Sequence, residues 1–269
     1  IFDFVQVNGT QADWRLRFAS VMLLNAATRL PSFSSSSNQN YLIAYNFFCQ
    51  LISDEIPRVV EVSLWSLGRI IQDVPQLVVE PQRFAMIVSR IPAVLQISST
   101  LAARCCWLLD FVFEAFHLCN ETAELLGNNF EQFSDMLLMI TELYETETIE
   151  TAYNVINNLV IYAPNGIYEK YNTLFKKVTA KLGKILQTTG GQLTTQSEFS
   201  HINWICYIVQ TITIFVGERI SNISNELMQM LLQLISKNGI LIPEVLNAIG
   251  AIARAIKENF SPYAHYKPF

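Results

Sequence analysis

Apolar residues recur with the period of an α-helix along nearly the whole chain of 269 residues. Within the segment 59–74, Val60, Leu64, Leu67 and Ile71 lie three or four residues apart, which places them on one stripe of a helix. Short breaks containing proline, glycine or polar residues divide this pattern into pairs of helices. A short helix pair cannot bury its apolar faces alone, so successive pairs must stack on one another. The sequence therefore predicts an all-α fold built by stacking.

The helix pairs recur at a nearly constant interval. We expect repeats at about 1–30, 38–74, 81–119, 122–163, 165–219 and 221–260, and the start of a further repeat at 262–269. Comparable positions in the second helices are Met22, Trp65, Trp107, Val155, Ile205 and Asn247, with spacings of 43, 42, 48, about 50 and 42 residues. HEAT and armadillo repeats recur at roughly 40–47 residues. We therefore predict a HEAT-repeat α-α superhelix, one solenoid segment over 1–269, which we expect to be truncated at both ends.

Composition agrees with a solenoid. Apolar residues make up 51% of the chain and charged residues only 15%. One compact core does not need so much apolar surface, whereas a helix between two neighbours in a solenoid buries two faces. Only 10 glycines and 9 prolines are present, which disfavours a sandwich or barrel with many tight turns.

A few residues predict local geometry. Pro57 and Pro243 fall at the first turn of a second helix, where the missing N–H is not needed. Asp13 is placed to cap the second helix of the first repeat. Gly68 and Gly250 each follow a matched position by three residues, and we expect both to allow a close approach between helices.

Net charge and cysteine usage bear on partners and compartment. The net charge is −5 and no basic patch stands out, which disfavours nucleic-acid binding and suits a basic protein partner. The 5 cysteines form an odd set without CxxC spacing and lie in apolar helical stretches, so we expect free thiols in a reducing compartment. The apolar run Ile202–Val216 is 15 residues long, which is shorter than a membrane span needs, and we expect a buried helix with no membrane insertion.

A search for chemistry finds no candidate. His117, His201 and His265 are far apart and lack neighbouring ligands at metal spacing. No phosphate-binding, nucleophile-elbow or zinc-protease motif is present. The acidic group Glu142, Glu145, Glu147 and Glu150 lacks the oxygen spacing of a calcium loop. We therefore expect no catalytic residue, no cofactor and no metal site, and a chain that is not an enzyme.

The tryptophans point instead to protein binding. Trp65 and Trp107 occupy equivalent places on successive second helices, which line the concave side of a HEAT solenoid. An indole beside carboxylates can hold a Lys or Arg side chain by cation–π contact and an ion pair. The candidate protein-binding residues on this concave face are Trp65, Trp107, Glu61, Glu114, Asp110 and Gln72. The alternative is that both tryptophans are core residues, and the sequence alone leaves the choice open.

Four stretches carry a likeness to a known family: 13–24 (DWRLRFASVMLL), 59–72 (VVEVSLWSLGRIIQ), 103–116 (ARCCWLLDFVFEAF) and 245–269. In order and spacing they resemble the middle third of importin-β, the karyopherin-β family of nuclear import receptors. The resemblance implies a superhelical receptor that carries cargo through nuclear pores and releases it when Ran-GTP binds. It also implies an importin-α-like adaptor or basic cargo as partner, nucleoporins and Ran-GTP as partners of the full-length protein, and a cytoplasmic and nuclear location.

In that family, tryptophans of the inner helices and nearby acids hold a basic segment of importin-α. Here this role carries over to Trp65 and Trp107, with Glu61 and Glu114 as the acids. Gln72 stands where the family pattern has a carboxylate, and Arg104 stands where the family tends to carry a polar amide. We expect these departures to weaken the electrostatic half of the site. Two alternatives stay open: a HEAT-repeat scaffold or regulatory subunit, and a different karyopherin that binds cargo directly.

Overall fold

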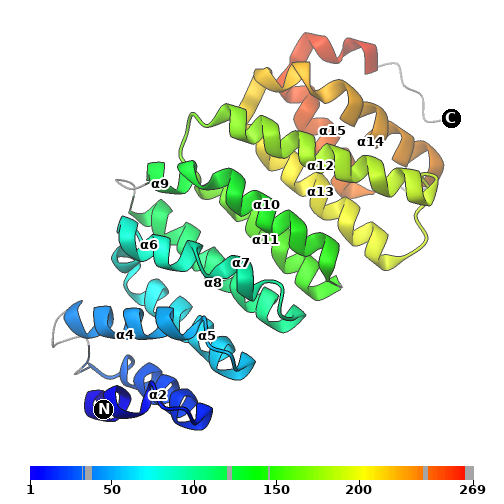
Figure 1. Ribbon diagram of the computed structural model, residues 1–269. Coiled ribbons are helices and arrows are strands. Elements are labelled where there is room, and N and C mark those ends of the chain that lie inside the picture. The colour runs from blue at the N-terminus through cyan, green and yellow to red at the C-terminus, as the bar shows by residue number, and fades with distance from the viewer. Residues whose placement is uncertain (32, 34–37, 120–122, 145, 239–241, 264–269) are drawn as a thin grey trace.

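The chain forms a ladder of helix pairs (Figure 1). The computed structural model describes residues 1–31, 33, 38–119, 123–144, 146–238 and 242–263, and none of these lies in a β-strand. The pairs stack in chain order from α1 and α2 at one end to α14 and α15 at the other. The predicted all-α solenoid is confirmed.

Each pair has a first and a second helix. The first helices are α1 (Phe2–Asn8), α4 (Asn38–Leu51), α6 (Pro81–Val88) with α7 (Ile91–Val94), α9 (Ala123–Asn128) with α10 (Phe130–Leu143), α12 (Tyr168–Thr189) and α14 (Ser224–Asn238). The second helices are α2 (Trp14–Ala27), α5 (Pro57–Asp73), α8 (Ser99–Leu118), α11 (Thr146–Tyr162), α13 (Gln196–Val216) and α15 (Pro243–Ile256). The 3₁₀ turns η1 (Pro75–Leu77), η3 (Gly217–Asn222) and η4 (Lys257–Tyr263) follow α5, α13 and α15. We propose that each of the six residue ranges expected from the sequence is one repeat. A further repeat was expected to start at 262–269, but residues 264–269 lie outside the described part of the chain.

Two first helices are interrupted. Between α6 and α7 the helix stops near Ser89, because Pro92 has no N–H to donate to the carbonyl four residues earlier. Between α9 and α10 the backbone of Asn129 leaves the helical region, with ψ near 4°. The first helices of the repeats expected at 81–119 and 122–163 are therefore each divided into two shorter pieces.

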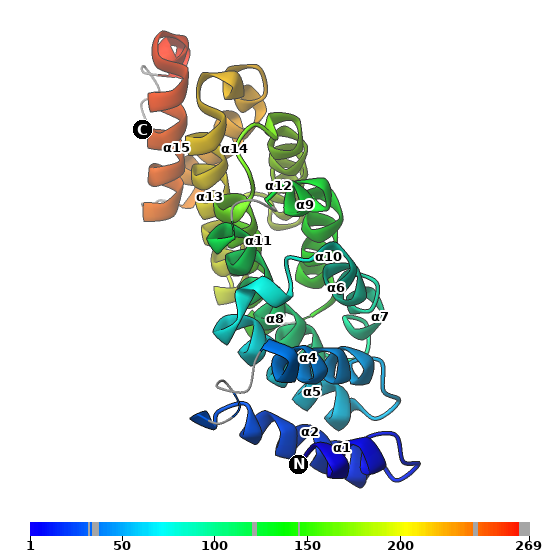
Figure 2. The ribbon, with the colours of Figure 1, turned by 90° about the vertical axis from the view of Figure 1, so that its left-hand side faces the viewer.

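The second helices form one continuous face of the ladder. Consecutive members of the series α2, α5, α8, α11, α13 and α15 pack directly against one another. Figure 2 shows α8, α11, α13 and α15 toward one side and α6, α7, α9 and α10 toward the other. We refer to the side formed by the six second helices as the second-helix face.

The predicted helix starts are confirmed. Pro57 and Pro243 begin α5 and α15 in the first turn. The Asp13 carboxylate accepts a hydrogen bond from the amide of Arg15 at 2.9 Å and so caps α2. These caps satisfy backbone groups that a helix leaves without intrahelical partners.

The two glycines behave differently. A Cβ atom on Gly68 would lie 2.5 Å from the ring atom Cζ3 of Trp107, so glycine here allows α8 to approach α5, as expected. A Cβ atom on Gly250 would meet only Nη1 of Arg254, at 3.7 Å, which is an ordinary contact. The expectation for Gly250 was therefore wrong. In the described part of the chain no second helix follows α15, and so none packs onto this glycine.

The most apolar helix is longer than the sequence run suggested. The helical stretch Gln196–Ser221 has 26 residues, and its most apolar 18-residue window has a mean hydropathy of 1.4, so by length and composition it could cross a membrane. The expected 15-residue run is thus part of a longer helix. This stretch packs against α11, α12 and α15, and 50% of its most apolar window is buried. A core helix passes the same test, and a single such helix is weak evidence for a membrane span.

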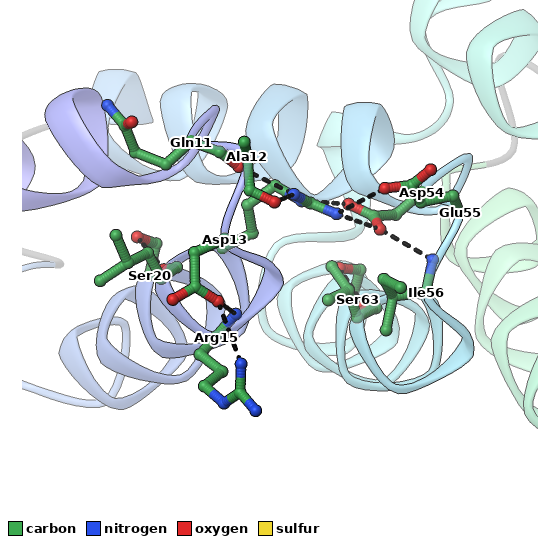
Figure 3. Close-up of polar contacts among 12 residues, drawn as sticks. Gln11, Ala12, Asp13, Arg15, Ser20, Asp54, Glu55, Ile56 and Ser63 are labelled. Atoms are coloured by element: carbon green, nitrogen blue, oxygen red, sulfur yellow. Dashed lines mark hydrogen bonds and ion pairs between the residues drawn. The ribbon is translucent and has the colours of Figure 1, made fainter.

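A buried ion pair fixes the first two repeats together. The Arg17 guanidinium donates from Nε and Nη2 to the two carboxylate oxygens of Asp54, at 2.7 and 2.9 Å. Its Nη1 donates to the carbonyls of Gln11 and Ala12, and Asp54 also accepts from the Ile56 amide at 2.9 Å. Figure 3 shows Gln11 and Ala12 on one side of this network and Asp54 with Ile56 on the other. The pair thus joins the turn inside the first repeat to the turn inside the second.

Asp54→Asn should destabilise the fold at neutral pH. Burial alone would raise the pKa of the Asp54 carboxyl, but the hydrogen bonds from Arg17 and Ile56 outweigh it and hold the pKa below its ordinary value. The side chains of Arg17 and Asp54 are only 10% and 4% exposed, so removing one partner should cost about 3–5 kcal/mol. A lowered folded-state pKa means that this contribution is complete above the ordinary pKa and is lost as pH falls through the folded-state value. Urea unfolding at pH 7 and in acid should therefore show a gap between wild type and variant that closes in acid.

Asp13→Asn is the matched control for that measurement. It removes the same charge from an exposed pair, and asparagine caps a helix as well as aspartate does. Its unfolding free energy should stay within a few tenths of a kcal/mol of wild type. Equal effects of the two substitutions would contradict the role assigned to the Arg17–Asp54 pair.

Gly68→Ala should also destabilise the fold. Alanine would press its Cβ atom into the rigid Trp107 ring, and overpacking of this kind costs about 1–3 kcal/mol. Gly250→Ala has room for the methyl group and should gain up to about 1 kcal/mol from helix propensity. Thermal unfolding of both variants should therefore shift in opposite directions, and a shared direction would rule out the Gly68–Trp107 contact.

Candidate protein-binding face

Trp65 lines a groove on the second-helix face. This groove, of about 500 Å³, lies between α2, α5 and α8. Its lining residues define what we call the Trp65 groove: Phe18, Met22, Arg58, Glu61, Val62, Trp65 and Arg104. Met22 and Trp65, matched by repeat spacing in the sequence, therefore line the same groove.

Trp107 lines a second depression, between α8 and α11. Its volume is about 410 Å³. We call it the Trp107 hollow, lined by Ser99, Thr100, Ala103, Arg104, Trp107, Glu147, Thr148 and Thr151. Arg104 belongs to both linings and so stands between the two depressions.

At three of the six repeats, the matched position lies at the seam between second helices. The Trp107 ring packs onto Gly68 of α5 and makes an edge-to-face contact with Phe111, with ring centroids 4.6 Å apart. At the equivalent positions, Val155 is 1% exposed and Ile205 is 0% exposed. The half-buried Trp107 ring thus packs in the seam and also lines a hollow, and its role in protein binding stays a prediction.

Glu61 already has an internal partner. Nε of Arg104 donates to its carboxylate at 3.2 Å, across the seam between α5 and α8. The two side chains remain 36% and 44% exposed, so a ligand can reach both. A basic ligand at Glu61 must therefore compete with Arg104.

Gln72 and the ring of Trp65 also have intramolecular partners. The Gln72 amide oxygen accepts from Nη1 of Arg69 at 3.0 Å. The guanidinium of Arg29 lies over the Trp65 ring, 5.5 Å from its centroid, as a cation–π pair. The surroundings of Trp65 are consequently richer in guanidinium groups than in carboxylates.

The carboxylates of Asp110 and Glu114 make the other end of α8 acidic. Asp110 is half-buried and accepts a hydrogen bond from the Asn158 amide at 2.7 Å. Burial raises the pKa of Asp110, and the Asn158 hydrogen bond opposes that shift. The pKa of Tyr162 on α11 is raised by burial and then by the charges of Glu114 and Asp110, so both carboxylates act on this phenol.

The structure therefore brings the six predicted residues into two settings. Trp65, Glu61 and Gln72 lie on α5 among arginines, whereas Trp107, Asp110 and Glu114 lie on α8 beside α11. Sequence reasoning missed Glu147, which comes from the next repeat, and missed that Arg104 pairs with Glu61. The separation of 43 residues between Glu61 and Arg104 equals one repeat spacing, and this signal could have found the pair.

Groups that could support catalysis are buried or apart. Among the described residues, no group of three His, Cys, Asp or Glu side chains could hold a metal ion. Burial raises the pKa of the Cys49 and Cys106 thiols to about 12, which disfavours the reactive thiolate. Burial lowers the pKa of His201, whose Nδ1 lies 3.0 Å from the Tyr153 hydroxyl within the α11–α13 contact. His265 and Glu145 lie outside the described residues.

The sequence of the chain is similar to those of known proteins. Residues 86–269 match a family model described as importin subunit beta-1-like, TPR repeats. Importin subunit beta-1 of Schizosaccharomyces pombe is 22% identical over 282 residues, which covers 100% of this chain and 32% of that protein. The chain thus spans about a third of the length of this relative.

Two solved structures show the same fold. One is a structure of Kap95p that concerns its effect on the switch loops of RanGDP. It superposes on this chain with a TM-score of 0.83 at 22% identity, and the match covers 97% of this chain and 31% of the Kap95p chain. Kap95 in a complex with Nup1 gives a TM-score of 0.77 at 21% identity, with coverages of 97% and 32%. At this identity the similarity supports the HEAT-type solenoid.

Arg104→Gln should leave the fold nearly unchanged. The Arg104–Glu61 pair is more than a third exposed on both sides, and exposed pairs of this kind contribute about 0–1 kcal/mol. Urea unfolding of Arg104→Gln should therefore give a far smaller change than Asp54→Asn. A loss as large as that of Asp54→Asn would mean that the pair is structural and is not available to a ligand.

Proposed function

The chain belongs to the importin subunit beta-1-like family, and from this premise we propose that it forms part of a nuclear import receptor. It acts by binding proteins and catalyses no reaction. Its second-helix face holds a basic, extended stretch of a partner, such as the importin-β-binding region of an importin-α-like adaptor. One observation carries the proposal: a half-buried tryptophan, Trp107, lines an open hollow together with the carboxylate of Glu147 from the next second helix.

Trp107 and the nearby acids suit a cationic side chain. Asp110 and Glu114 lie one and two turns beyond Trp107 on the same face of α8, and Glu147 reaches the hollow from α11. A lysine or arginine of the partner would lay its aliphatic stem on the indole and its charge beside a carboxylate. The seam contact of Trp107 with Gly68 holds the ring in place, so little ordering is needed on binding.

The Trp65 groove is the adjoining part of the same path. Its apolar lining of Phe18, Met22 and Val62 can cover the aliphatic part of a bound segment, with Trp65 as the aromatic contact. Glu61 and Gln72 contribute less than the acids of α8, because both are engaged by arginines of this chain. A disordered segment would order along the two depressions and gain affinity from many modest contacts.

Other partners of the whole receptor follow from its relatives. The solved Kap95 structures include one concerned with RanGDP and one complex with Nup1. We extend this to Ran-GTP as the regulator that releases cargo, to nucleoporins as docking partners, and to a location in cytoplasm and nucleus. These partners belong to the full-length protein, since the chain spans about a third of the relative's length.

Glu114→Gln combined with Glu147→Gln should weaken the binding of a basic peptide. Glu147 is exposed and Glu114 is half-buried, and each carboxylate contributes about 0.2–1 kcal/mol to an ion pair, so the double variant should bind about two- to thirtyfold more weakly. Fluorescence anisotropy with a labelled lysine- and arginine-rich peptide at 0.1 M salt measures this directly. The effect should shrink at 0.5 M salt because exposed charges are screened.

A matched control removes two carboxylates from the first helices. Glu131 on α10 and Glu169 on α12 are exposed, and the double change to Gln alters net charge by the same amount. It should leave the affinity within about twofold of wild type, as expected for long-range charge effects alone. Equal weakening by both pairs would mean that only net charge matters, and no binding by wild type would refute the proposed function.

A further inference from the structure

The two depressions on the second-helix face differ in charge. Around the indole of Trp65, the guanidinium groups of Arg29, Arg58 and Arg104 oppose the single carboxylate of Glu61. Among the residues lining the Trp65 groove, Glu61 is the only acid, and Arg104 already binds it at 3.2 Å. This groove therefore carries an excess of positive charge, opposite to the net charge of the chain.

The next helix has the opposite balance. On α8 the only arginine is Arg104, at the groove side, while Asp110 and Glu114 follow toward the other end. Among the residues that line the Trp107 hollow, Glu147 is the one carboxylate, and Arg104 is shared with the groove. The arginine-rich groove is thus followed by the carboxylates Asp110 and Glu114 further along α8.

Two of these guanidinium groups can bind a ligand without breaking an ion pair. Arg29 and Arg58 are exposed, and Arg29 is held above an aromatic ring and so remains free to donate hydrogen bonds at its edge. Planar guanidinium groups favour carboxylates because they can donate two parallel hydrogen bonds. A cation entering the same groove would meet these arginines before it reached Glu61.

From this arrangement we propose that the Trp65 groove binds a carboxylate-bearing stretch of the partner segment. The preferred ligand is then dipolar: acidic side chains meet Arg29 and Arg58, and basic side chains a few residues away meet the acids around Trp107. Apolar stems in the acidic stretch contact Phe18 and Met22 on the groove wall. This inference rests on the proposed function for its basic half and adds the acidic half.

The test compares three labelled peptides by fluorescence anisotropy. One joins an acidic block to a basic block, the second replaces each acidic residue by Gln, and the third contains the acidic block alone. Wild type should bind the dipolar peptide about three- to tenfold more tightly than the Gln peptide, which corresponds to one or two exposed ion pairs. Arg58→Gln should reduce that ratio toward one, because it weakens binding of the dipolar peptide relative to the Gln peptide.

Arg254→Gln is the matched control. It removes one exposed arginine from α15, a second helix at the far end of the ladder, and alters net charge by the same amount as Arg58→Gln. The peptide ratio should stay at the wild-type value in this variant. A ratio that falls equally in both variants would overturn the proposal, because it would then reflect only the overall charge.

The outcomes separate this inference from the proposed function. If the dipolar and Gln peptides bind wild type equally well, or the Gln peptide binds more tightly, the acidic half is wrong while the basic half stands. If the peptide with only the acidic block binds wild type and Arg58→Gln weakens that binding, the groove assignment holds even when the Gln peptide does not bind. Failure of the acidic peptide and of the dipolar peptide together would remove the proposed groove ligand.

Discussion

Packing of each second helix against the next is the constraint on which the rest of this structure depends. A single pair of short helices cannot bury its apolar faces, so the chain gains stability only through contacts between neighbours in the ladder. The closeness of α5 and α8 requires a residue without a side chain at Gly68, where the Trp107 ring fills the space. The buried Arg17–Asp54 pair sets the relation of the first two repeats in a similar way, by joining their turns through a bidentate contact.

Because the contacts run between repeats, the candidate binding sites do so as well. The Trp65 groove takes residues from three second helices, and the Trp107 hollow takes residues from two. The Thr211 hydroxyl donates to Oδ1 of the Asn157 side chain at 2.6 Å, and the side-chain amide of Asn158 donates to Asp110, so polar pairs also bridge successive helices. The same seam therefore supplies both the stability of the ladder and the positions of the side chains that meet a ligand.

The two tryptophans of the second-helix face differ in the charges that surround them. The resemblance to import receptors implies tryptophans accompanied by acids along the inner helices, and the acids around Trp107 fit that pattern. At Trp65 the acid is engaged by Arg104, and Arg29 covers the ring. An arginine-rich groove followed by carboxylates further along α8 can select a ligand by its order of charges as well as by its net charge, because each misplaced charge meets a like charge.

Much of the fold could be predicted from the sequence, because helical periodicity, the caps at Asp13, Pro57 and Pro243, and the repeat spacing are local signals. The helical wheel also placed Trp65 with Glu61 and Trp107 with Glu114. It could not show that Gly250 lacks a packed neighbour, that Val155 and Ile205 are buried in the seam, or that Glu147 reaches Trp107. Which charges meet across a seam, as Arg104 meets Glu61, depends on the rotation of one repeat against the next. Only the tertiary structure sets that rotation, because it results from the summed packing of many side chains and not from any local pattern.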